Sequence, residues 1–159
     1  MGSGKSKTGP LLARKLGYDF VDTDHLIEQK QGKLIKEIFQ DSGEAHFRQI
    51  EMEILHSLDS RKNVVVATGG GLPCYFDNME WINAHGLSVY FKVPLGMLIQ
   101  RLIQDKGERP ILEGLTETEL AKKVRSQVEF RELYYSSSKI IFDVAHRSLD
   151  SLVKEISDF

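Results

Sequence analysis

The chain has 159 residues, of which 41% are hydrophobic and 28% charged, and its formal net charge is −2. This length and composition fit one globular domain over residues 1–159, and the near-neutral charge excludes the broad basic field that attracts nucleic acid or an anionic membrane. The single cysteine, Cys74, excludes an intrachain disulfide. With no apolar run long enough for a membrane span and no signal segment, we expect a cytoplasmic monomer.

Helical patterns and short apolar runs alternate along the chain. We expect helices over 10–16, 26–31, 35–39, 44–58, 79–85, 95–103, 116–135 and 148–156. We expect strands over 18–21, 64–67, 87–93 and 140–142. Thr118 is the expected cap of the long helix near the C-terminus. This alternation predicts a three-layer α/β/α fold with a central parallel sheet, whose ligands bind at the carboxyl ends of the strands.

The N-terminal residues Gly2, Ser3, Gly4, Lys5 and Ser6 match the second half of a phosphate-binding loop, G-x-x-x-x-G-K-[ST]. Glycines let backbone N–H groups converge on phosphate oxygens, and the following helix turns its positive end toward them. Lys5 would then reach the β- and γ-phosphates of ATP, and Ser6 would offer a hydroxyl to Mg²⁺. The alternative is an unrelated Met-Gly-Ser leader, because the first glycine of the motif is not in the sequence.

Two carboxylates, Asp22 and Asp24, follow the first expected strand. One could help to hold hydrated Mg²⁺, and the other could accept the proton of an attacking hydroxyl. An isolated Asp-x-Asp is more often a helix cap or a turn. Its place after the strand that follows a phosphate loop favours the catalytic interpretation.

Several spaced motifs together resemble the shikimate kinase family over essentially the whole chain. They are Asp22-Thr23-Asp24, Gly43-Glu44-Ala45-His46-Phe47-Arg48 with Glu51, Val65-Val66-Ala67-Thr68 before Gly69-Gly70-Gly71, Arg109-Pro110-Ile111-Leu112, and Arg131 before Leu133-Tyr134-Tyr135. The resemblance implies a P-loop kinase fold with a substrate-binding helical part at about 23–60 and a lid at about 104–117. It also implies transfer of the ATP γ-phosphoryl group to the 3-hydroxyl of shikimate, a step of aromatic amino acid synthesis.

The resemblance also implies roles for individual residues. Asp24 would be the base, acting with Lys5 and the lid residue Arg109. Arg48 and Arg131 would clamp the substrate carboxylate, for which a planar guanidinium is suited. The other expected substrate contacts are Gly69, Gly70, Gly71, Phe39 and Phe47. ATP would be bound by Gly2, Ser3, Gly4, Lys5, Ser6, Lys7, Arg101 and Arg109, and Mg²⁺ by Ser6 and Asp22.

Simpler interpretations compete for some of these residues. Arg48 could pair with Glu44 or Glu51 on a helix surface, which would contribute under about 1 kcal/mol. Phe39 and Phe47 could be ordinary core residues. Three glycines after a buried strand are harder to explain by structure alone, because glycine carries an entropic cost.

The chain departs from the family pattern at three places. The family has a buried central strand before the phosphate loop, and we expect its absence here to expose two strand edges. Lys7 stands where a small hydroxyl residue is usual, and Leu133 where proline is usual. A kinase for gluconate or a nucleoside monophosphate, and a non-catalytic nucleotide-binding or protein-binding domain, are the competing functions.

Overall fold

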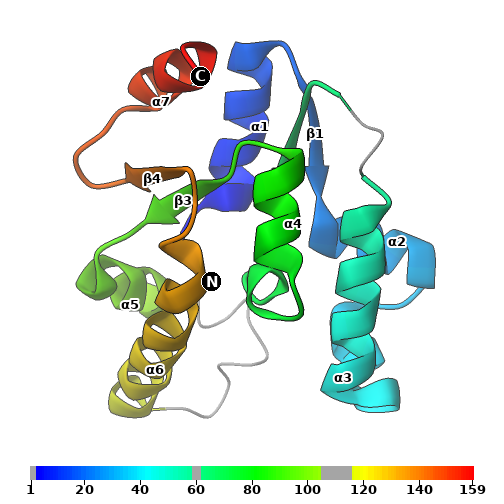
Figure 1. Cartoon of the computed structure of the whole chain (residues 1–159). Coiled ribbons are helices and arrows are strands. Elements are labelled where there is room, and N and C mark those ends of the chain that lie inside the picture. The colour runs from blue at the N-terminus through cyan, green and yellow to red at the C-terminus, as the bar shows by residue number, and fades with distance from the viewer. Residues whose placement is uncertain (1–2, 59–61, 105–115) are drawn as a thin grey trace.

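The computed structural model describes residues 3–58, 62–104 and 116–159. Its described strands form two parallel pairs. β1 (Asp19–Asp22) pairs with β2 (Val64–Ala67), with Asp19 opposite Val64. β3 (Val89–Lys92) pairs with β4 (Ile140–Asp143), with Val89 opposite Ile140. Figure 1 shows the pairs on opposite sides of the molecule.

The helices alternate with these strands, as the sequence predicts, and the α/β fold class is confirmed. The helical elements are α1 (Lys5–Leu16), α2 (Thr23–Gln31), α3 (Ile35–His56), the short 3₁₀ helix η1 (Leu72–Cys74), α4 (Asn78–His85), α5 (Leu95–Gln104), α6 (Glu117–Tyr135) and α7 (Leu149–Ser157). Within the described ranges, every helix is too short or too polar to cross a bilayer.

Helix α1 lies against both β1 and β2 and also contacts α7. The contact with β1 is close at Gly9, where a Cβ atom would lie 2.4 Å from the Phe20 ring. Leu12 of α1 joins the apolar core formed by β3, β4 and α7. The helix that begins at the phosphate loop is therefore packed against elements of both strand pairs.

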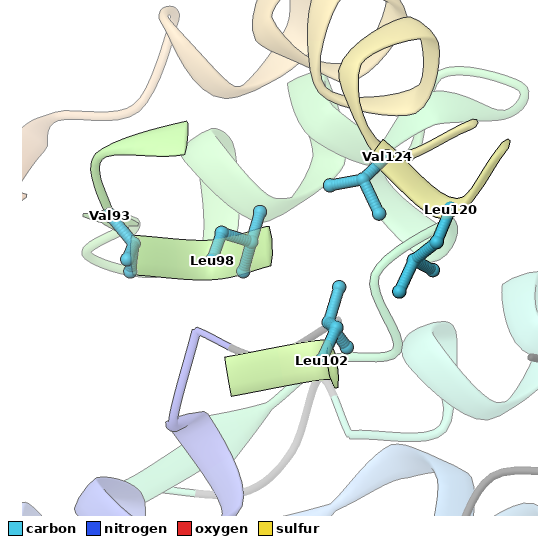
Figure 2. Packing of buried hydrophobic residues seen from close by; sticks show 5 residues of the cluster. All are labelled: Val93, Leu98, Leu102, Leu120 and Val124. Atoms are coloured by element: carbon cyan, nitrogen blue, oxygen red, sulfur yellow. The ribbon is translucent and has the colours of Figure 1, made fainter. Parts of the chain in front are cut away.

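Two further apolar cores hold the outer helices in place. Ile27 of α2 packs with Ile38, Phe47, Ile50 and Ile54 of α3. On the other side, α5 packs on α6 through Leu98, Leu102, Leu120 and Val124 (Figure 2). The two cores thus support opposite ends of the molecule.

Helix α3 contains a break at Gly43, whose φ of 78° and ψ of 175° are not helical. This conformation is essentially restricted to glycine. The sequence predicts two helices separated at this position, and the two straight parts of α3 correspond to them. The bend sets the direction of the segment that carries Arg48.

A cavity of about 640 Å³ lies between β2 and β3, which do not pair with each other among the described residues. Its lining is largely apolar and includes Leu12, Leu55, Val65, Phe91 and Val128. The edges of β2 and β3 that face this cavity are unpaired among the described residues.

Candidate functional site

The phosphate-loop segment leads directly into α1. Gly4 has a φ of 87°, a conformation that favours glycine, and its carbonyl accepts hydrogen bonds from the backbone N–H groups of Lys7 and Thr8. The Lys5 ammonium donates to Ser3 Oγ at 3.1 Å. The residues from Ser3 to Ser6 therefore sit at the N-terminus of a 12-residue helix, where backbone N–H groups and the helix dipole favour an anion.

The two expected magnesium ligands lie next to each other. Ser6 Oγ is 3.1 Å from Asp22 Oδ2, although the residues belong to α1 and β1. The second carboxylate oxygen of Asp22 accepts a hydrogen bond from the Asp24 backbone at 3.0 Å, so Asp22 also caps α2. A hydroxyl and a carboxylate on one side of a phosphate-binding loop are the hard oxygen donors that Mg²⁺ prefers.

Asp24 lies in the first turn of α2, two residues after Asp22. Burial raises the pKa of its carboxyl above the ordinary value, and the charges of Asp22 and Glu28 raise it further, while Lys5 acts in the opposite direction. The carboxylate also faces the triple-glycine segment, because a Cβ atom on Gly69 would lie 2.5 Å from Asp24 Oδ1. A carboxylate with a raised pKa is a stronger base than an ordinary aspartate.

The triple-glycine segment follows β2 and is hydrogen-bonded to the first residue of α2. The Gly69 N–H donates to the hydroxyl of Thr23 at 2.9 Å, and Thr23 is fully buried. A Cβ atom on Gly71 would lie 2.5 Å from the Arg48 guanidinium. A side chain at Gly69 or Gly71 would therefore displace the ends of Asp24 or Arg48 from these positions.

Arg48 is held by two carboxylates and by aromatic rings. Its guanidinium donates to Glu51 at 2.6 Å and to Glu44 at 2.8 Å. Glu51 is 1% exposed, so this ion pair is more than the surface contact that the simpler interpretation assumed. The guanidinium also lies 4.1 Å from the centre of the Tyr75 ring and within 6 Å of the expected pocket residues Phe39 and Phe47. Phe47 is itself buried in the α2–α3 core.

Arg131 reaches the same region from the other side of the molecule. Burial raises the pKa of the Glu51 carboxyl and raises that of the Cys74 thiol to about 11. The positive charges of Arg131 and Arg48 act in the opposite direction and lower both pKa values. One turn further along α6, the Tyr135 hydroxyl donates to the Gly70 carbonyl. The two arginines, 83 positions apart in the sequence (131 − 48), therefore flank one site beside the glycine segment.

The remaining predicted residues fall into two groups: some lie on α1 and α5, away from the two arginines and Asp24, and others lie outside the described residues. Gly2, Arg109 and most of the expected lid belong to the second group. Lys7 is exposed on α1, and Arg101 is half-buried on α5. Their assignment to ATP stays a prediction.

Sequence reasoning missed the residues that connect the predicted ones. Thr23 appears in the sequence only as the residue between two aspartates, but its buried hydroxyl accepts the hydrogen bond of the glycine segment. Tyr75 and Tyr135 carry hydroxyls that bond to Glu44 and Gly70. The spacing of Arg131 and Tyr135 by four helical positions was the available signal, because it places both side chains on one face of α6.

The fold and the site together define a P-loop phosphotransferase for a small acceptor: a phosphate-binding helix terminus, a raised-pKa aspartate and two arginines beside a glycine segment. The shikimate kinase family model matches residues 1–159, and the chain belongs to that family. A shikimate kinase of Parabacteroides distasonis is 40% identical over 158 residues, which cover 99% of this chain and 91% of the relative.

Solved structures agree with this assignment. The crystal structure of shikimate kinase from Bacteroides thetaiotaomicron has a TM-score of 0.90 and 38% identity to this chain, and covers 99% of it and 92% of the other chain. Shikimate kinase from Acinetobacter baumannii in complex with shikimate has a TM-score of 0.84 and 35% identity, with 99% and 87% covered.

Proposed function

We propose that the protein transfers the γ-phosphoryl group of ATP to the 3-hydroxyl of shikimate, giving shikimate 3-phosphate and ADP. The observation that carries this proposal is the convergence of Asp24, Arg48 and Arg131 on the triple-glycine segment. These residues provide one base and two carboxylate-binding groups, which match an acceptor with a hydroxyl and a carboxylate. The bound shikimate in the Acinetobacter baumannii relative supports the same acceptor.

In this mechanism the arginines position the acceptor and Asp24 takes the proton of the attacking hydroxyl. Phosphoryl transfer depends mainly on alignment and charge neutralisation, so no covalent enzyme intermediate is needed. Lys5 supplies a positive charge at the phosphate loop. Ser6 and Asp22 would hold Mg²⁺, which neutralises phosphate charge when bound. We expect Arg109 to add a further positive charge on the transferring group.

A coupled ADP-release assay tests the acceptor. Wild-type protein is mixed with ATP and Mg²⁺, and shikimate, gluconate and no acceptor are compared. We expect turnover only with shikimate, and loss of about 10²- to 10⁴-fold in kcat in Asp24→Asn, the contribution of a general base. Asp41→Asn is the control, because the exposed Lys33 is the ion-pair partner of Asp41 in the described part of the chain. Turnover with gluconate alone would exclude shikimate as the acceptor.

A further inference from the structure

Tyr135 is the last residue of α6, and it connects Arg131 to the triple-glycine segment. Its hydroxyl donates to the Gly70 carbonyl, which follows β2. Burial raises the pKa of this phenol to about 12, and the Arg131 guanidinium counteracts part of that rise through its charge and a hydrogen bond. The hydroxyl therefore contacts a substrate-facing loop and stands one helical turn beyond a residue expected to clamp the substrate.

The Tyr135 ring packs against a residue of β3. It packs on the Tyr90 ring with 4.9 Å between the centroids. Tyr90 in turn donates to Glu132 at 2.7 Å, and Lys92 donates to the same carboxylate at 2.8 Å. These contacts hold the end of α6 on the β3–β4 pair, so the Tyr135 hydroxyl spans the distance from that pair to the loop after β2.

We infer that Tyr135 is a positioning residue that sets the distance between Arg131 and the triple-glycine segment. Arg131 lies on α6, which is bonded to β3, and Gly70 follows β2. Among the described residues, the β3–β4 pair and the β1–β2 pair do not hydrogen-bond to each other. Tyr135 lies on the same face of α6 as Arg131, and its hydroxyl bonds directly to the Gly70 carbonyl. The inference deepens the proposed function and rests on it for the identity of the substrate carboxylate.

The test compares Tyr135→Phe with Tyr90→Phe. Both substitutions keep the ring and remove one partly buried hydroxyl, but only the first removes the bond to Gly70. Initial rates give the KM for shikimate, the KM for ATP and kcat. Hydrogen–deuterium exchange of residues 69–72 reports the glycine segment without substrate, and thermal unfolding confirms that both variants are folded.

We expect Tyr135→Phe to raise the KM for shikimate about five- to tenfold, the scale of one lost hydrogen bond, with kcat and the KM for ATP little changed. Exchange at residues 69–72 should become faster than in Tyr90→Phe. The inference is overturned if exchange is the same in both variants, or if both raise the KM for shikimate equally. If the wild-type protein showed no turnover with shikimate, the proposed function would be refuted. The comparison of hydrogen–deuterium exchange in the two variants would still decide the role of Tyr135.

Discussion

At the scale of single residues, the triple-glycine segment shows how tightly the site is assembled. Gly69 faces Asp24 and Glu51, and Gly71 faces Arg48, at distances that leave no room for a methyl group. Neither glycine has a positive φ, so close approach, and not backbone conformation, requires glycine at these positions. The composition of the segment is therefore a consequence of the side chains around it.

Gly69→Ala should lose both stability and activity. The new Cβ would lie 2.5 Å from Asp24 Oδ1 and 3.0 Å from Glu51 Oε1, and overpacking of this kind costs about 1–3 kcal/mol. Gly96→Ala in the first turn of α5 is the control, because no atom lies within 4 Å of its Cβ position, so alanine there should not destabilise the protein. Urea unfolding of both variants measures the difference. Equal effects would contradict the steric explanation.

The raised pKa of Asp24 predicts the acid side of the pH–rate profile. Only the ionised carboxylate accepts a proton, so kcat/KM should fall on acidification with a midpoint above 3.8, the ordinary value for aspartate. The same shift means that the folded state holds this proton more tightly than the unfolded state. Its contribution to stability is therefore full below that ordinary value and is lost as the pH rises through the raised pKa.

Removing a neighbouring negative charge tests the cause of this shift. Glu28 raises the pKa of Asp24, so Glu28→Gln should move the acid midpoint of kcat/KM to lower pH. Glu53→Gln is the control, since Glu53 is not among the groups that act on Asp24. An unchanged midpoint in Glu28→Gln would show that this charge does not tune the base.

At the scale of elements, the sequence was sufficient for most helices and strands but not for their ends. The apolar runs placed all four described strands within about two residues, because burial dictates those runs. Helix α1 begins at Lys5, ahead of the expected start at Pro10, which the helix accommodates in its interior. Helix starts depend on local hydrogen bonds that hydrophobic spacing does not encode.

The cap of α6 is a second example of this limit. The expectation that Thr118 caps the helix is wrong, because Thr116 does so: its hydroxyl accepts from the Glu119 backbone while Glu119 bonds back to Thr116. Thr116→Ala should therefore cost about 1 kcal/mol of stability, and Thr118→Ala under about 0.5 kcal/mol. Thermal unfolding of the two variants distinguishes them. A larger loss in Thr118→Ala would refute this assignment of the cap.

At the scale of the whole molecule, the candidate site lies between two halves, one built on the β1–β2 pair and one on the β3–β4 pair. Asp24 and Arg48 could be predicted because they stand in motifs of chemically distinctive residues. The contacts that assemble the site link residues far apart in the sequence: Thr23 and Gly69, within the β1–β2 side, are 46 positions apart, and Tyr135 and Gly70, which join the two sides, are 65 apart. No local pattern reports such pairings, since they depend on how the elements pack.

Binding of shikimate should stabilise the protein as a whole. At a concentration about 100 times its Kd, a ligand specific for the folded state adds about 2.7 kcal/mol, or about 5–10 °C in Tm for a chain of this size. We expect Arg131→Ala to lose most of this shift and Asp24→Asn to keep most of it, because we propose that the arginine binds the carboxylate. A full shift in Arg131→Ala, measured by scanning fluorimetry, would remove Arg131 from the substrate clamp.

The separation of β2 from β3 also bears on the cooperativity of unfolding. The α2–α3 core beside one strand pair and the α5–α6 core beside the other are candidate local unfolding units, while α1 packs against elements of both pairs. Arg48 belongs to one unit and Arg131 to the other. A carboxylate held by both arginines would act as a noncovalent crosslink, so that acceptor binding would make the two halves unfold together.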